Sequence, residues 1–223
     1  MTEQQTRNLL VELGASLFNR RFSSGSGGNI SVKLDDGTIL ATPTNSSLGR
    51  LVPGKISLLD ADGAVLSGHS PSKECAFHLA LYAAKPGCGA VVHLHSPYAT
   101  ALSCRLDCNP DDVIRPFTPY YIMKAAPLPL IPYFKPGSPK IAEVLAEKAA
   151  TANCFLLANH GPVVTGKTLE DAVNTMEELE ETARLVFLLR AAGEGNVRYL
   201  SDAEILELAP SEKNAHIIAR QAG

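Results

Sequence analysis

Hydrophobic and polar positions along this chain follow two periods, one typical of helices and one typical of strands. Apolar residues recur every three or four positions in four long segments, which predicts amphipathic helices over residues 4–21, 73–84, 138–151 and 168–192. Shorter patterns of the same kind predict helices over residues 98–104 and 202–208. Apolar or alternating runs bounded by turn residues predict strands over residues 30–33, 55–59, 64–66, 89–95, 128–132, 154–158 and 162–165.

Glycine, aspartate and proline indicate where these elements are connected. Asp36-Gly37 and Asp62-Gly63 are typical of tight hairpin turns. Residues 107–139 are rich in proline, but they also contain enough apolar residues to predict an ordered, loop-rich connection with one short strand. Tyr120 and Tyr121 lie in this connection, and each is either a candidate acid catalyst or a buried structural tyrosine.

Composition narrows the classes of protein. We expect one domain over residues 1–223, because no break in composition divides the chain, and 45% hydrophobic with 19% charged residues is ordinary for a globular protein. The formal charge of −3 gives no basic field, so nucleic-acid binding is not expected. The chain shows no signal peptide and no apolar run of about 18 residues, which argues against a membrane span. Together with five cysteines, an odd number, this predicts a cytoplasmic protein with free thiols.

The main chemical signal is the stretch AVVHLHSPYA. His93 and His95 stand two positions apart, so both imidazoles project from one face if the strand includes them. Such a pair suits one divalent metal, although alone it is also compatible with a polar strand end. Glu74, near a helix start, and His160, at a turn between two strands, complete a set of three nitrogens and one carboxylate. This set most simply suits Zn²⁺, with Mn²⁺ or Co²⁺ as alternatives, and leaves room for a substrate.

Three other segments predict an anion site. The first is a glycine-rich run that leads into a strand and lets the backbone approach a ligand. The second is a threonine-rich loop, which offers small hydrogen-bonding groups or is simply solvated. The third is a helix start, which favours negative charge. The candidate phosphate-binding residues in them are Gly28, Asn29, Thr44, Asn45, Ser72 and Lys73. We interpret His78, four residues after Glu74, as a packing residue, because E-x3-H lacks the context of a zinc protease.

In this order and spacing, the motifs GGNISV, TPT, PSKE, AVVHLHSPYA and ANHGPVV resemble the class II aldolase/adducin family over about residues 9–190. The resemblance implies a three-layer α/β/α fold around a central mixed, mainly antiparallel sheet. It also implies zinc on His93, His95 and His160, and a homotetramer with active sites at subunit interfaces. Glu74 matches the family's acidic residue, which contacts the metal and exchanges a proton.

Two departures from the family pattern bear on the substrate. Lys73 stands where the typical sugar-phosphate aldolase has serine, and Asn45 stands where it has glycine, which argues against an ordinary fuculose- or ribulose-phosphate. The segments RPFTPYY and IPYFKPG resemble a subgroup that decarboxylates a 3-oxo-tetronate 4-phosphate to dihydroxyacetone phosphate and CO₂. The resemblance therefore implies a carbon–carbon lyase acting on a small phosphorylated sugar acid through a metal-bound ene-diolate, with Glu74 or Tyr120 delivering a proton.

Two alternatives remain open from the sequence. A sugar-phosphate aldolase or 4-epimerase would use the same metal and phosphate groups. A non-catalytic, adducin-like binding domain belongs to a different class, and such domains can lose the metal ligands, which this chain keeps.

Overall fold

An eight-stranded sheet forms the centre of the protein, which we describe from a computed structural model covering residues 1–191, 193–208 and 217. The strand order is β4-β3-β2-β1-β5-β8-β7-β6, and neighbouring strands are antiparallel except for β6 beside β7. The strands are β1 Asn29–Lys33, β2 Ile39–Ala41, β3 Ser57–Leu59, β4 Val65–Ser67, β5 Ala90–His93, β6 Leu130–Ile131, β7 Cys154–Leu157 and β8 Gly161–Gly166.

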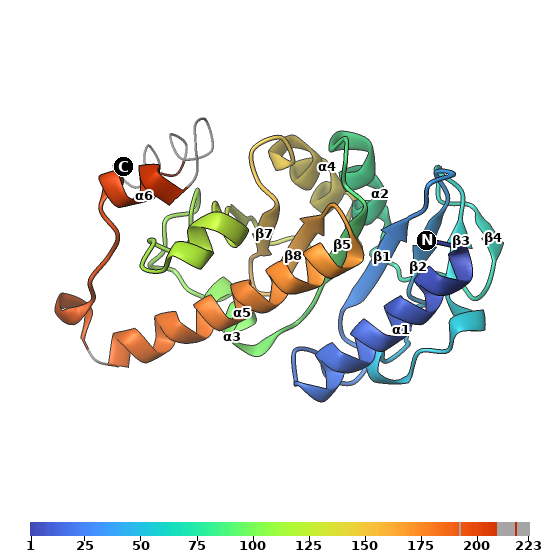
Figure 1. Cartoon of the computed structure of the whole chain (residues 1–223), viewed down its shortest axis with the longest axis horizontal. Helices are drawn as coiled ribbons and strands as arrows, with labels where there is room; N and C mark the ends of the chain where they lie inside the picture. Colours follow the sequence, from blue (N-terminus) through green and yellow to red (C-terminus); the bar gives the residue numbers. More distant parts are fainter. Residues whose placement is uncertain (192, 209–216, 218–223) are drawn as a thin grey trace.

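Helices cover both faces of this sheet (Figure 1). α1, α3 and α5 pack on one face, and α2 and α4 pack together on the other, so the predicted three-layer α/β/α fold is confirmed. The helices are α1 Glu3–Asn19, α2 Cys75–Ala84, α3 Pro97–Ser103, α4 Pro139–Lys148, α5 Leu169–Ala191 and α6 Asp202–Leu208, with short turns at Leu48–Arg50, Pro53–Lys55, Tyr121–Ala125 and Glu194–Asn196. Among the described helices, none is long and apolar enough to cross a membrane.

The two cores follow from side-chain alternation along the strands. On β5, Val92 faces the layer of α1 and α5, whereas Val91 faces the layer of α2 and α4. Cys154 and Phe155 on β7 divide in the same way, and all four side chains are almost fully buried. Burying a Val or Phe side chain contributes roughly 1.5–3 kcal/mol, so the central strands hold both helical layers in place. His93 follows Val92 and therefore faces the layer of α2.

The structure corrects two predicted boundaries and adds one turn that was not predicted. The α2 helix begins at Cys75 and not at residue 73, because Ser72 N–H donates to the Thr42 carbonyl and keeps the preceding chain extended. The β5 strand ends at His93, opposite the first residue of β1, so His95 lies beyond the sheet ladder. The proline-rich connection contains a π-helical turn, Tyr121–Ala125, that its irregular apolar spacing did not indicate. One domain over residues 1–223 stays a prediction, since residues 192, 209–216 and 218–223 lie outside the described part.

Candidate active site

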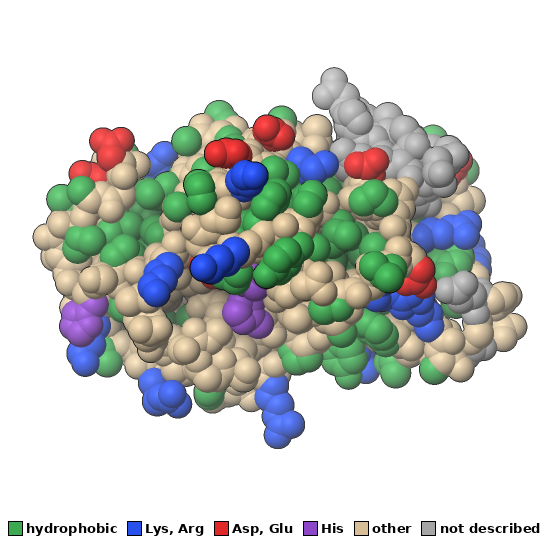
Figure 2. Space-filling view, turned by 180° about the vertical axis from the view of Figure 1, so that it is seen from behind, with side chains coloured by type: hydrophobic (Ala, Val, Ile, Leu, Met, Phe, Trp, Pro, Cys, Tyr) green, Lys and Arg blue, Asp and Glu red, His purple; other side chains and the backbone are tan. Residues whose placement is uncertain are grey.

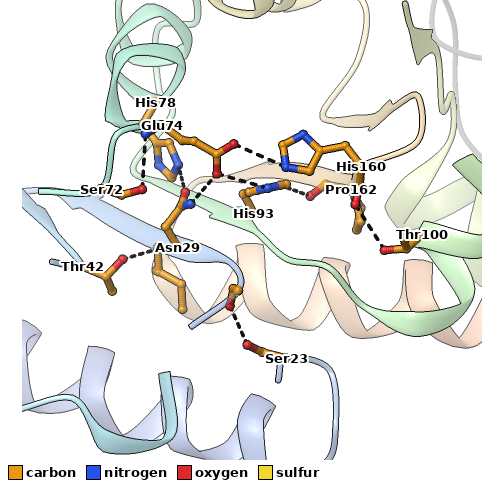
Figure 3. Close-up of polar contacts among 12 residues, drawn as sticks. Ser23, Asn29, Thr42, Ser72, Glu74, His78, His93, Thr100, His160 and Pro162 are labelled. Atoms are coloured by element: carbon orange, nitrogen blue, oxygen red, sulfur yellow. Dashed lines mark hydrogen bonds and ion pairs between the residues drawn. The ribbon is translucent and has the colours of Figure 1, made fainter. Parts of the chain in front are cut away.

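Strand register brings the predicted ligands together. Asn29 of β1 lies directly opposite His93 of β5, and His93 lies opposite Val163 of β8 on its other side. His160 occupies the turn just before β8, so it reaches the same end of the sheet. Glu74 is the residue before α2, and its carboxylate turns toward the histidines and does not cap its own helix (Figure 3).

Glu74, His93, His95 and His160 form one cluster. One potential ligand atom from each lies within 4.8 Å of all the others. The ring of His160 lies 4.8 Å from that of His93 and 4.9 Å from that of His95, measured between centroids. On the face shown in Figure 2, histidine reaches the surface near the middle of the molecule, beside Lys or Arg side chains. The four predicted metal ligands, which come from separate segments of the sequence, are thus adjacent in space.

The protonation of His93 is determined by its hydrogen bond. Nδ1 lies 2.8 Å from the Pro162 carbonyl, which only accepts, so Nδ1 carries the proton and Nε2 presents a lone pair. Burial, followed by the nearby His160 and His95, holds the pKa of His93 well below its usual range, which keeps the ring neutral. A neutral imidazole with its remote nitrogen bonded to a carbonyl is the form in which histidine binds metals.

Among the described residues, two buried acceptor atoms in this cluster have no hydrogen-bond partner: His93 Nε2 and Glu74 Oε1. His93 Nε2 lies 3.4 Å from Glu74 Oε2, and His160 Nε2 lies 3.4 Å from Glu74 Oε1. Lone pairs on a neutral imidazole and a carboxylate repel at this distance, and a divalent cation among them would satisfy both atoms. The donor set therefore fits a divalent metal ion.

Two glycines allow the loops to close around the histidine segment. Gly28 has φ +81°, and a Cβ there would lie 2.8 Å from the His93 carbonyl oxygen. Gly161 has φ +153°, and a Cβ there would lie 2.3 Å from the Leu94 carbonyl oxygen. Both positions combine a left-handed conformation with close backbone approach, so only glycine fits without displacing the segment that carries His93 and His95.

Backbone hydrogen bonds join the loops that carry the predicted phosphate-binding residues. Thr44 N–H donates to Ser70 O, Ser72 N–H donates to Thr42 O, and Thr42 N–H donates to Ile30 O. These bonds place the threonine loop between the start of β1 and the start of α2, beside the cluster. Asn45 has φ +56°, the conformation that glycine adopts most readily and asparagine tolerates, which accounts for asparagine at the family's glycine position.

The candidate phosphate residues differ in availability. Asn45 and Lys73 are exposed, and Thr44 and Ser72 are half-buried. Asn29 is only 5% exposed, and its amide contacts Glu74 and His78, so this side chain is engaged inside the protein. Its predicted role at a phosphate stays untested, and its contacts indicate a role beside the carboxylate.

The two adjacent tyrosines are clearly distinguished. Tyr121 is fully buried, and its hydroxyl donates to Asp112 Oδ1 at 2.7 Å. Tyr120 is 61% exposed, and within the described residues no hydrogen bond, ion pair or ring contact links it to the four-residue cluster. Tyr121 is therefore a structural residue of the proline-rich connection, and a catalytic role of Tyr120 remains a prediction.

Glu180 is a functional candidate that no sequence motif indicates. This buried carboxylate on α5 accepts hydrogen bonds from Ser96 Oγ at 2.7 Å and from the Tyr98 and Ala99 N–H groups at 2.8 Å each. It thereby fixes the start of α3 directly after His95. In the sequence Glu180 is one of several acidic residues on a long helix. Only the packing of α3 against α5 brings it to the start of α3.

Replacing Glu180 with alanine is expected to lower the free energy of unfolding by about 2–4 kcal/mol, because it leaves buried donors without an acceptor. Chemical denaturation measures this change. Glu181→Ala is the matched control, since Glu181 is the next residue and, within the described part of the chain, its carboxylate pairs only with Arg184 on the surface, an interaction worth less than about 1 kcal/mol. Equal losses in the two variants would contradict the role given to Glu180.

Comparisons with known proteins agree with this fold and site. Residues 8–187 match the model of the family described as Class II Aldolase and Adducin N-terminal domain. The 3-oxo-tetronate 4-phosphate decarboxylase of Haemophilus influenzae is 52% identical over 208 residues, which are 93% of this chain and 98% of that protein. A crystal structure of YgbL from Escherichia coli, also 52% identical, superimposes with a TM-score of 0.89 over 92% of this chain and 98% of that chain. L-fuculose phosphate aldolase from Methanococcus maripaludis is 36% identical over 80% of this chain and 94% of that protein.

The chain belongs to the class II aldolase and adducin family. The resemblance stated from its motifs is thus confirmed, including its similarity to the decarboxylase subgroup. The prediction of a lyase is confirmed as well, since the relatives at this level of identity carry the names of carbon–carbon lyases.

Proposed function

We propose that this protein decarboxylates a 3-oxo-tetronate 4-phosphate to dihydroxyacetone phosphate and CO₂ through an ene-diolate. The observation that carries the proposal is a pair of buried acceptor atoms, His93 Nε2 and Glu74 Oε1, that have no hydrogen-bond partner among the described residues. They converge with His95 and His160, beside the loops that carry the predicted phosphate-binding residues. The decarboxylase from Haemophilus influenzae, 52% identical over almost its full length, supports the choice of substrate.

His93, His95, His160 and Glu74 would hold the metal, for which we propose Zn²⁺, with Mn²⁺ or Co²⁺ as alternatives. A divalent cation supplies Lewis-acid stabilisation of the negative charge that develops on the substrate oxygens. The protein contributes the rigid placement of these ligands at the ends of β5 and β8.

The remaining groups bind the substrate and move a proton. The 4-phosphate would bind to the loops containing Gly28, Thr44, Asn45 and Ser72, which orients the reacting carbons at the cluster. Lys73 is exposed beside Ser72 and would balance the additional negative charge of a sugar acid. As the C1–C2 bond breaks, CO₂ departs and the electron pair remains on C2 and C3 as the ene-diolate. Glu74 or Tyr120 then returns a proton to C2, which gives dihydroxyacetone phosphate.

A sugar-phosphate aldolase is the second candidate, favoured by the 36% identity to the L-fuculose phosphate aldolase of Methanococcus maripaludis. In that reaction the same kind of ene-diolate forms, but the leaving group is an aldehyde instead of CO₂. Lys73 favours the decarboxylase, because it adds a cation where the typical aldolase has a neutral serine.

We expect the zinc-loaded protein to release CO₂ and dihydroxyacetone phosphate in equal amounts from 3-oxo-tetronate 4-phosphate. Trapped CO₂ and a coupled assay for dihydroxyacetone phosphate measure the two products. L-fuculose 1-phosphate and ribulose 5-phosphate, tested in parallel, should react far more slowly. Aldehyde release from a sugar phosphate without any CO₂ from the sugar acid would replace this proposal with the aldolase. Inactivity on all of them after zinc addition would favour a binding domain.

We also propose that the protein is a cytoplasmic homotetramer whose active sites lie at subunit interfaces. The large side chains of Tyr120 and Met123, 61% and 51% exposed, support this assembly, since contact with a neighbouring subunit would bury them.

A further inference from the structure

A continuous series of buried hydrogen bonds leads from the interior of the α2 layer to Glu74. Tyr82 Oη lies 2.8 Å from Ser31 Oγ, and Ser31 Oγ lies 2.7 Å from His78 Nδ1. His78 Nε2 lies 2.6 Å from Asn29 Oδ1, and Asn29 Nδ2 lies 2.9 Å from Glu74 Oε2. Figure 3 shows the part from His78 through Asn29 to the carboxylate and on to His93 and His160.

The direction of every bond follows from the carboxylate at its end. Asn29 presents its NH₂ group to Glu74, whose carboxylate oxygen accepts, and therefore presents its carbonyl oxygen to His78. That oxygen also only accepts, so His78 carries its proton on Nε2 and has a lone pair on Nδ1. The Ser31 hydroxyl must then donate to Nδ1 and accept from the Tyr82 hydroxyl. All four donors therefore point toward Glu74.

Burial makes this arrangement rigid. His78 is 2% exposed, Ser31 is fully buried, and Tyr82 is 7% exposed. Burial, aided by His93 and opposed by Glu74, lowers the pKa of His78 to about 3, so its ring is neutral and has a single N–H to donate. The ring also stacks on Phe77 with centroids 4.8 Å apart, which leaves it little freedom to turn. A buried network of this kind fixes one arrangement when all its members are satisfied.

We propose that His78, Ser31 and Tyr82 are positioning residues, which act through Asn29 to hold the Glu74 carboxylate in its reactive orientation. Glu74 Oε2 accepts from the Asn29 amide, so Oε1, which has no hydrogen-bond partner among the described residues and lies 3.4 Å from His160 Nε2, is the oxygen turned toward the candidate metal cluster. This inference rests on the proposed function, because it gives Glu74 its role in proton transfer.

The position of Glu74 explains why such support is needed. It stands before the first turn of α2, and its long side chain makes no capping bond there, so the helix alone does not fix the carboxylate. The hydrogen-bond network ends at the carboxylate of the candidate metal cluster, so it supplies the support that the helix does not.

The first test compares two replacements of His78. His78→Phe keeps a ring but removes the donor to Asn29, and we expect kcat to fall about 10–100-fold, as is typical when a partner that orients a metal ligand is lost. KM should change less than about threefold and zinc should remain bound, since the three histidines are intact. His78→Gln places an amide N–H near the position of Nε2–H and should restore kcat to within about fivefold of the wild type.

Ser31→Ala and Ser57→Ala form a matched pair. Both serines are fully buried in the same sheet and donate one hydrogen bond, Ser31 to His78 and Ser57 to the His69 carbonyl. We expect both variants to melt at lower temperature, but only Ser31→Ala to lose kcat, about threefold or more. If His78→Phe does not fold, the comparison of Ser31→Ala with Ser57→Ala still tests the positioning role.

The protonated nitrogen of His78 gives a readout that does not depend on activity. Long-range ¹H–¹⁵N spectra of protein labelled with ¹⁵N-histidine should show His78 as the Nε2–H form. A proton on Nδ1, wild-type kcat in folded His78→Phe, equal kcat losses in the Phe and Gln variants, or equal losses in the serine pair would overturn the proposal. kcat is measured on whichever substrate the wild type turns over, so absence of CO₂ from the wild type tests only the proposed function.

Discussion

Replacing His93 with alanine is expected to abolish metal retention and to reduce kcat/KM by about 10³-fold or more. His93 contributes a fully buried lone pair at the centre of the cluster, and its loss leaves Glu74 with only His95 and His160 as neighbouring candidate ligands. Metal ions stabilise developing charge by several kcal/mol, and each 1.36 kcal/mol is tenfold in rate. Metal content by mass spectrometry and steady-state kinetics measure the two effects together.

His69→Ala is the control for this variant. His69 is an exposed histidine outside the four-residue cluster, so its replacement should keep both metal and turnover. Full activity in His93→Ala would refute its assignment as a ligand. Lost activity with metal still bound would give His93 a role in the reaction itself.

Replacing Glu74 with glutamine is expected to lower kcat about 10²–10⁴-fold, the usual contribution of a positioned acid–base group. The amide keeps the shape of the side chain, and its carbonyl oxygen can still accept from Asn29, so the network behind it should persist. Metal should remain bound, more weakly, because the three histidines are unchanged. Single-turnover kinetics together with a metal titration separate the loss of proton transfer from the loss of metal.

Glu147→Gln provides the same chemical change at an exposed site on α4 and should have wild-type kinetics. If Glu74→Gln keeps its kcat and only binds metal less well, then Glu74 is a ligand and Tyr120 becomes the leading candidate for the proton donor.

The order of helices and strands was largely predictable, because helical and strand periodicities are local properties of the sequence. The amphipathic pattern over residues 138–151 corresponds to α4 Pro139–Lys148, and the apolar run over residues 154–158 corresponds to β7 Cys154–Leu157. The errors lie where tertiary contacts override local signals. Pro71 pairs with Pro43 and Ser72 N–H donates to the Thr42 carbonyl, which ties this segment to the threonine loop, so α2 starts later than its apolar pattern suggests.

The candidate ligands were also accessible from sequence, since histidine pairs and a nearby carboxylate are distinctive in type and spacing. The groups that orient these ligands could not be predicted from the sequence. The sequence predicts a packing role for His78, because E-x3-H lacks the context of a zinc protease. Ser31 and Tyr82 lie inside a predicted strand and a predicted helix, with no motif that marks them. Only the pairing of β1 with β5 and the packing of α2 on β1 bring these side chains into hydrogen-bond contact.

The sequence by itself determined the family, the elements, and the four residues Glu74, His93, His95 and His160, because residue type and local period carry that information. Only the tertiary structure decided that Tyr121 is buried and that Asn29 donates to Glu74 Oε2, which leaves Oε1 turned toward the histidines. The physical reason is that hydrogen-bond direction depends on which acceptor each donor meets in the folded chain. In the network that ends at Glu74, contacts between residues more than forty positions apart determine this, and no local pattern encodes them.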